Sequence, residues 1–87
     1  MNPKKATQAQ LEKLKELRTQ LISPSIDIRI GILVHIDQIL KDIDFISSFH
    51  SNLSTDLVIY KMQREKFNFD SIVQTVNHAI NYYEELK

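Results

Sequence analysis

The amino-acid sequence predicts an all-α fold, a compact bundle of four to five short helices. The chain of 87 residues contains one glycine, whereas β-rich folds need glycine at the positive-φ positions of hairpins and bulges. Apolar residues recur at three- and four-residue steps, as they do on one face of a helix. No stretch approaches the roughly 18 apolar residues of a membrane span. We therefore expect one helical domain over residues 7–87, preceded by a flexible polar tail, residues 1–6.

The first helix is expected from about Thr7 to Ile22. Its apolar residues form a single stripe, which comprises Leu11, Leu14, Leu17, Leu21 and Ile22. Pro24 disfavours helical geometry at the residue before it, so the helix should end there. Ser25 can cap the next helix, and Asp27 in the first turn suits the positive end of the helix dipole.

The second helix, about residues 26–43, is the most apolar element and is expected to lie at the centre of the bundle. One stripe comprises Ile28, Ile32, Ile36, Ile39, Leu40 and Ile43, and a second comprises Ile26, Ile30, Leu33 and Val34. The alternating isoleucines also suit a β-strand over residues 26–34. Helical spacing continues well beyond residue 34, which favours the helix.

Three further helices are expected, over residues 44–52, from residue 54 to about Lys66, and from the Asp70 cap to about Leu86. The first of them carries Phe45, Ile46 and Phe49. The second is predicted from a run of small polar residues typical of a helix start, Ser54, Thr55 and Asp56. The last has a buried face at helical spacing, Ile72, Val76, Ala79, Ile80 and Tyr83.

The sequence offers little chemistry for catalysis or for binding a metal. It has no cysteine, and His35, His50 and His78 do not lie at the spacing of metal ligands. A single glycine leaves no glycine-rich phosphate loop. Asp42 and Asp44 point to different sides of a helix and do not form a carboxylate pair. We expect no enzyme, no cofactor and no metal site.

Charge is balanced overall but unevenly distributed along the chain. Eleven Lys and Arg match eleven Asp and Glu, which argues against direct nucleic-acid binding. Residues 1–22 carry five basic and two acidic side chains, and residues 23–60 carry two basic and five acidic ones. A basic rim then stands beside an aromatic pair: Lys61, Arg64 and Lys66 beside Phe67 and Phe69. Such a rim suits an acidic, hydrophobic peptide.

The Phe67-Asn68-Phe69 turn allows two interpretations. In one, both rings pack inward around the Asp70 cap as hydrophobic staples. In the other, at least one ring lies on the surface and anchors a partner peptide. Val58 and Ile59 are similarly open, because they can fill the core or form a partner or dimer surface.

A set of residues at helical spacing in the second half of the chain carries a family resemblance. It comprises Leu40, Ile43, Phe45, Ser47, Phe49, Leu53, Leu57, Tyr60, Lys61, Ile72, Val76, Ile80, Tyr83 and Leu86. This pattern resembles the N-terminal domain of transcription elongation factor TFIIS and the related integrase-binding domain of the lens-epithelium-derived growth factor family. The resemblance covers roughly residues 10–87. It implies a nuclear bundle of about five helices that docks short disordered motifs of transcription and chromatin proteins.

In the integrase-binding branch, the ligand pocket lies between two interhelical turns. The second turn is similar to Phe67-Asn68-Phe69, whereas Ser23-Pro24 lacks the apolar residue and the acid of the first. Asp27 matches an acidic position at the start of the next helix. The resemblance implies that Phe67 and Phe69 supply apolar contact and that Ile26 and residues 23–27 form the opposite wall. The basic residues that it implies for steering acidic peptides are Lys61, Arg64 and Lys66.

Two other functions are expected as alternatives. Residues 21–26 and 66–70 resemble stretches of the immunity proteins that protect Gram-positive bacteria from their own class IIa bacteriocins. Those are free-standing helical bundles of similar length, and Met1 is consistent with a complete small chain of this kind. This resemblance implies a cytoplasmic protein that acts at a membrane receptor. The other alternative is a weakly homodimerising adaptor module that uses Val58, Ile59 and the two phenylalanines.

Overall fold

A computed structural model describes residues 4–86 of the protein and confirms the all-α class. The elements are α1 (Gln8–Gln20), α2 (Ile26–Ile43), α3 (Ser48–Gln63), the 3-10 turn η1 (Arg64–Lys66) and α4 (Phe69–Glu85). No strand occurs in this part of the chain, so the alternative of a strand over residues 26–34 is wrong. Residues 1–3 of the predicted tail lie outside the described residues, and residues 4–7 precede α1 without regular structure.

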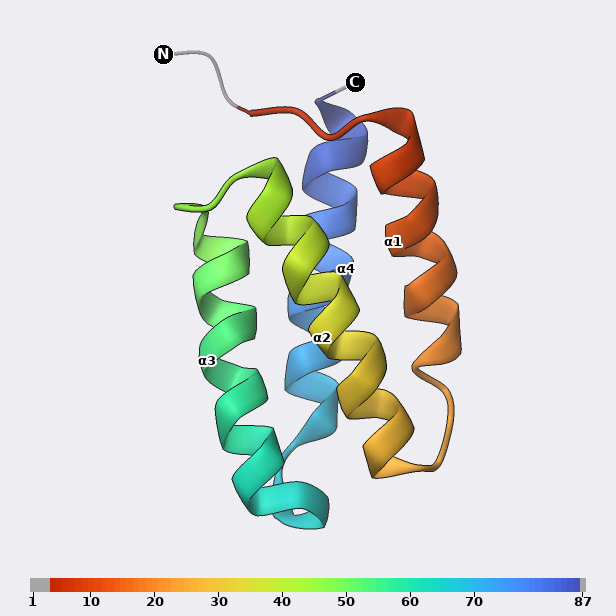
Figure 1. Ribbon diagram of the computed structural model, residues 1–87, viewed down its shortest axis with the longest axis vertical. Coiled ribbons are helices and arrows are strands. Elements are labelled where there is room, and N and C mark those ends of the chain that lie inside the picture. The colour runs from red at the N-terminus through yellow and green to blue at the C-terminus, as the bar shows by residue number, and fades with distance from the viewer. Residues whose placement is uncertain (1–3, 87) are drawn as a thin grey trace.

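The four helices form a closed ring around one core (Figure 1). Each helix packs against its neighbour in sequence, and α1 also packs against α4. The short connections 21–25, 44–47 and 64–68 leave consecutive helices antiparallel and side by side. The α1–α2 and α3–α4 connections meet at one end of the bundle, which we call the lower end after its place in Figure 1.

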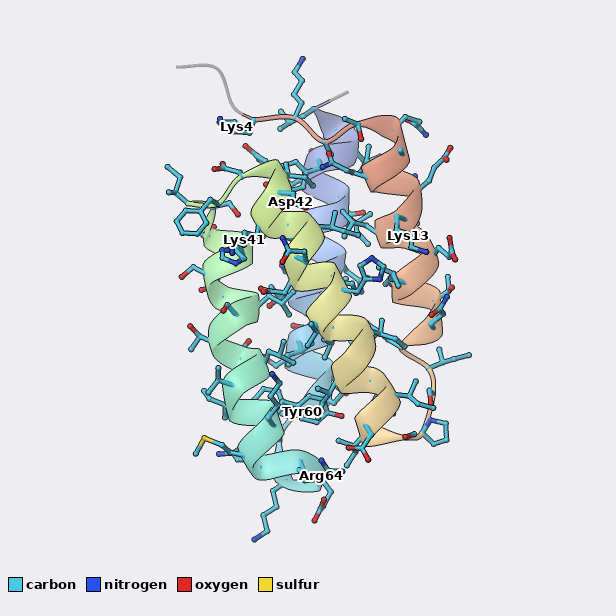
Figure 2. The ribbon with its side chains drawn as sticks, viewed as in Figure 1. Lys4, Lys13, Lys41, Asp42, Tyr60 and Arg64 are labelled. Atoms are coloured by element: carbon cyan, nitrogen blue, oxygen red, sulfur yellow. The ribbon has the colours of Figure 1, made fainter. Side chains whose placement is uncertain are left out.

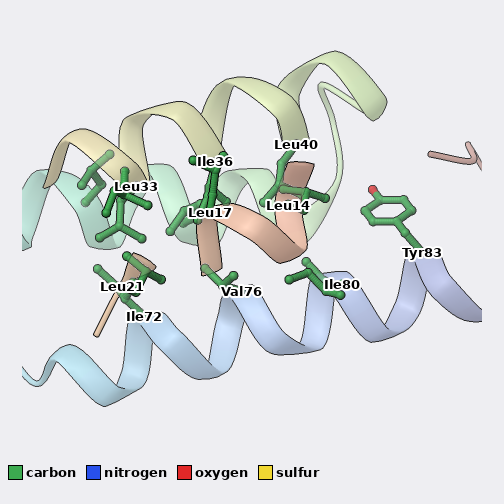
Figure 3. Close-up of a cluster of buried hydrophobic side chains, with 14 of the residues drawn as sticks. Leu14, Leu17, Leu21, Leu33, Ile36, Leu40, Ile72, Val76, Ile80 and Tyr83 are labelled. Atoms are coloured by element: carbon green, nitrogen blue, oxygen red, sulfur yellow. The ribbon is translucent and has the colours of Figure 1, made fainter. Parts of the chain in front are cut away.

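Every helix contributes its apolar stripe to the core (Figure 3). The buried residues include Leu11, Leu14 and Leu17 of α1, Leu33, Ile36 and Leu40 of α2, and Leu53, Leu57 and Tyr60 of α3. All five residues of the predicted α4 face are buried, so that prediction is confirmed. Even α2 is not apolar enough to cross a bilayer, and no other helix among residues 4–86 could do so.

Three helices begin at hydroxyl side chains that cap them. The hydroxyl oxygens of Thr7, Ser25 and Ser47 accept hydrogen bonds from the backbone N–H three residues later, at 3.0, 3.3 and 3.1 Å. The predicted helix starts near Thr7 and at Ser25 are therefore confirmed. Ser47 is a start that the sequence pattern did not indicate.

The predicted division of residues 44–66 into two helices is wrong, because α3 runs unbroken from Ser48 to Gln63. Residues 54–56, predicted as a helix start, lie in its middle. No proline or glycine interrupts this stretch, and one continuous face of it is buried in the core. The actual break comes earlier, and it leaves Phe45 and Ile46 exposed in the α2–α3 connection.

The first helix is shorter than predicted, and this changes the position of Ile22. The α1 helix ends at Gln20, and the Leu21 N–H donates to the Arg18 carbonyl at 3.1 Å. Leu21 is still buried, but Ile22 leaves the stripe and is 84% exposed. Ile28 and Val34 are also exposed, because α2 contacts α1 and α3 and turns its remaining side to solvent.

Candidate functional site

Four of the seven residues predicted to bind a partner line a cavity at the lower end of the bundle. They are Ile26 at the start of α2, and Arg64, Phe67 and Phe69 in or next to the α3–α4 connection. These two segments are distant in sequence, and the antiparallel ring places both at the same end (Figure 1). The remaining three residues, Asp27, Lys61 and Lys66, are exposed and line neither cavity at this end.

Phe67 and Phe69 are both half-buried, because each packs one side against Tyr60. Each phenylalanine ring centroid lies 5.4 Å from that of Tyr60, and Tyr60 is only 1% exposed. Tilted aromatic pairs at this separation attract one another beyond simple burial. The rings therefore serve the core with one side and offer the other to a cavity at the lower end.

The predicted cap of the last helix is wrong by two residues. Asn68 occupies the N-cap position, and its side chain makes no capping hydrogen bond. Asp70 lies in the first turn of α4 and is exposed. Phe69, already packed on Tyr60, is the first helical residue, so the aromatic contact coincides with the helix start. An acidic side chain in the first turn still favours the positive end of the helix dipole.

Arg64 adopts a strained backbone conformation at this end, with φ 52° and ψ −118°. Residues other than glycine rarely adopt a positive φ, and such a conformation costs about 1–3 kcal/mol. The side chain makes an ion pair with Asp27, with Nη2 and Oδ1 3.1 Å apart. Asp27 is 83% exposed, so this pair contributes at most about 1 kcal/mol. Figure 2 shows Arg64 below Tyr60, where the chain leaves α3.

Arg29 belongs to the same group, although the sequence patterns did not indicate it. Its guanidinium carbon lies 4.1 Å from the centroid of the Phe69 ring, a cation–π contact. Its Nε donates to the Ser23 carbonyl at 2.6 Å. Arg29 follows Ile26 by three residues and therefore lies on the same side of α2. The three-residue spacing from Ile26 places Arg29 on the side of α2 that faces the site. The sequence alone does not show that Phe69 packs against this side.

Two cavities open at the lower end and share Arg29 and Phe69 as a common wall. The first cavity has a volume of about 320 Å³ and is lined by Pro24, Ile26, Arg29, Tyr60, Arg64, Glu65, Phe67 and Phe69. The second cavity has a volume of about 240 Å³ and is lined by Arg18, Leu21, Ile22, Arg29, Phe69, Asp70 and Val73. Both combine apolar walls with arginine, which fits recognition of a ligand that is partly apolar and partly anionic.

The opposite end of the bundle is built around buried aromatic and hydroxyl groups. Burial raises the pKa of Tyr83, and the nearby Asp44 charge adds to this, while a hydrogen bond with Ser47 lowers it. His50 Nε2 lies 3.6 Å from Asp37 Oδ1, and His50 Nδ1 lies 3.1 Å from the Phe45 carbonyl oxygen. Within the described residues, no three His, Asp or Glu side chains are grouped so that they could hold a metal ion.

Two of the four residues assigned to an alternative dimer surface, Val58 and Ile59, take different positions on α3. Val58 is 56% exposed, whereas Ile59 is only partly exposed. Neither lines the two cavities at the lower end. A surface formed by this part of α3 would therefore be separate from the cavity that Phe67 and Phe69 share.

Comparison of the chain with protein-family models, with curated proteins and with solved structures finds no match. The lower end is therefore the part of the structure that bears on function. It combines a strained arginine turn, two half-buried aromatic rings and two cavities with arginine in their walls.

Proposed function

We propose that this chain is a non-enzymatic protein-interaction domain that binds a short peptide segment in the first cavity. The observation that carries the proposal is the juxtaposition of half-buried Phe67 and Phe69 with Ile26, Arg29 and Arg64 around one cavity. Backbone strain of the kind seen at Arg64 clusters at functional sites, where the surrounding structure holds it in place. A cavity of about 320 Å³ can hold a few side chains of a partner peptide, but it is too small to hold part of a folded domain.

The chemistry of the walls indicates what kind of peptide binds. Phe67, Phe69 and Ile26 offer apolar surface to an aromatic or aliphatic anchor, and a few such anchors dominate binding energy. Arg29 and Arg64 place positive charge at the same opening, opposed by Glu65 and by Asp27, which pairs with Arg64. Arginine in a partly apolar wall favours carboxylates, because its planar donors match a carboxylate in pairs. The expected ligand is an acidic peptide with apolar anchors.

The finer form of this proposal follows the resemblance to the TFIIS N-terminal domain. Under it, the ligand is a disordered motif of a transcription or chromatin protein, and the domain acts in the nucleus. Lys61 and Lys66 are exposed near the cavity and contribute long-range attraction to acidic segments rather than direct contact.

Selection from a random peptide library displayed on phage tests the function, because it does not require that the partner be identified first. The full chain is immobilised, and enriched peptides are synthesised and titrated against it. We expect acidic residues and at least one large apolar residue in the enriched peptides. Phe67→Ala should weaken their binding by about tenfold or more, as is typical of an anchor contact.

Phe45→Ala is the matched control, because it makes the same substitution at an exposed ring at the other end of the bundle. It should leave peptide binding unchanged. Circular dichroism of both variants establishes that they are folded. The proposal fails if folded Phe67→Ala binds every enriched peptide as well as the parent, or if no peptide is enriched. Sedimentation of the parent reports self-association separately, and a dimer that Val58→Asp dissociates would support the adaptor alternative.

A bacteriocin immunity protein is the second candidate, because the number of helices departs from the TFIIS resemblance. The union of the predicted third and fourth helices leaves four α-helices in residues 4–86, fewer than the five that the TFIIS resemblance implies. Expression in a strain sensitive to class IIa bacteriocins distinguishes the two functions. Resistance that Phe67→Ala removes and Phe45→Ala retains would assign the lower end to immunity. Unchanged sensitivity to a panel of these bacteriocins would count against this candidate.

A further inference from the structure

The second cavity adds Arg18 to the Arg29 that the proposed function uses, and neither arginine has a carboxylate partner among the described residues. Arg18 of α1 and Arg29 of α2 both line it, on either side of the α1–α2 connection. The rest of the wall is mainly apolar, with Leu21, Ile22 and Val73. Across residues 4–86, neither arginine lies within ion-pair distance of an acidic side chain.

Both guanidinium groups are held in place through Nε by neutral acceptors. Arg18 Nε donates to the Asn77 side-chain oxygen, and Arg29 Nε donates to the Ser23 carbonyl. Arg29 is further held by its stack on Phe69. Arginines fixed in this way keep their positive charge, and they lose less conformational freedom when they bind an anion.

The charge around this cavity is unbalanced in favour of an anion. Asp70 is the acidic residue in its lining, and it is exposed at the start of α4. It stands against two arginines that are both part-buried in their hydrogen bonds. A partly desolvated positive charge attracts a carboxylate more strongly than an exposed one does, because water screens it less.

We propose that the second cavity binds an acidic residue of the partner peptide together with an adjacent apolar side chain. This rests on the proposed function and extends it. A segment anchored at Phe67 reaches the second cavity by crossing the wall that Arg29 and Phe69 form between the two. Its carboxylate then meets Arg29 and Arg18, and its next apolar side chain contacts Ile22 and Val73. Ile22, 84% exposed in the free protein, is covered in the complex.

Hexanoate is a suitable probe, because it joins one carboxylate to an apolar chain. Nuclear magnetic resonance of the nitrogen-15-labelled full chain follows the Nε–H signals of Arg18 and Arg29 and the backbone amides of Ile22 and Val73. We expect saturable shifts of these signals, and binding about tenfold weaker for the uncharged analogue hexanamide. Arg18→Gln should weaken hexanoate binding by about tenfold. Lys41→Gln, which removes an exposed charge at the other end of the bundle, should leave it unchanged.

Equal shifts by hexanoate and hexanamide, or unsaturable shifts spread over all basic residues, would overturn the proposal. The peptides selected on phage separate its failure from that of the proposed function. If the selected peptides lose binding to Phe67→Ala but bind Arg18→Gln as tightly as the parent, the first cavity is the peptide site. The second cavity then takes no part in binding, and only the further inference fails. If hexanoate binds saturably at Arg18 but Phe67→Ala leaves the affinity for the selected peptides unchanged, the second cavity binds a carboxylate. The proposed function of the first cavity then fails.

Discussion

Replacing Tyr60 by phenylalanine should stabilise this protein. Tyr60 is 1% exposed, and its hydroxyl is buried without a hydrogen-bond partner among residues 4–86. An unpaired buried hydroxyl costs about 1–3 kcal/mol, and the substitution removes that group alone. The ring contacts with Phe67 and Phe69 remain. We expect the free energy of unfolding to rise by about 1 kcal/mol, which raises Tm by about 4–8 °C in a domain of this size.

Tyr83→Phe provides a matched control, because it makes the same chemical change at a second buried tyrosine. Tyr83 is 2% exposed, but its hydroxyl shares a hydrogen bond with Ser47. Removing a hydroxyl that is paired loses that hydrogen bond and costs about 1 kcal/mol. The two substitutions therefore have opposite expected signs at nearly identical burial.

Urea unfolding followed by far-ultraviolet circular dichroism measures both effects. The dependence of the free energy of unfolding on urea should stay constant, because neither substitution changes the surface exposed on unfolding. If Tyr60→Phe destabilises the protein as much as Tyr83→Phe does, the Tyr60 hydroxyl has a partner in the folded protein. That result would refute the reasoning.

Arg64→Gly should raise the free energy of unfolding in urea by about 1 kcal/mol, because the backbone strain that it relieves is larger than the ion-pair energy lost with Asp27. A decrease in the free energy of unfolding would contradict this. Ser47→Ala should cost about 1–2 kcal/mol in the same assay, since the α3 cap and a Tyr83 partner both disappear; an unchanged midpoint would rule out both roles. The raised pKa of Tyr83 means that the folded state favours the neutral phenol. The contribution of the phenol to the free energy of unfolding is therefore full below pH 10.0, and it is lost as pH rises through the folded pKa. Alkaline urea titrations should show a shallower decline for Tyr83→Phe than for the parent, and identical declines would refute this.

The candidate site was partly predictable from sequence. Phe67 and Phe69 stand out because two aromatics flank a short polar turn, and Arg64 is part of a visible basic cluster. Arg18 and Arg29 do not stand out, because each is a single basic residue in an ordinary amphipathic helix. Their importance comes from neighbours that are distant in the chain, Asn77 for Arg18 and Phe69 for Arg29.

Lys61 and Lys66 show the reverse case. Their sequence position beside the aromatic pair predicted that they steer acidic peptides at the site, and both are exposed and line neither cavity. Lys61 lies in the last turn of α3, and Lys66 is the last residue of the 3-10 turn η1. Neighbours in sequence were therefore not neighbours in the site.

The sequence by itself determined the all-α class, the starts of α1 and α2, and the buried face of α4. These depend on caps and apolar spacing, which act over three or four residues. The tertiary structure decided that α3 continues through Ser54, that Ile22 is exposed, and that Arg64 adopts a positive φ. Such features depend on whether distant helices bury a face or leave it open, and packing energy of that kind outweighs local preference.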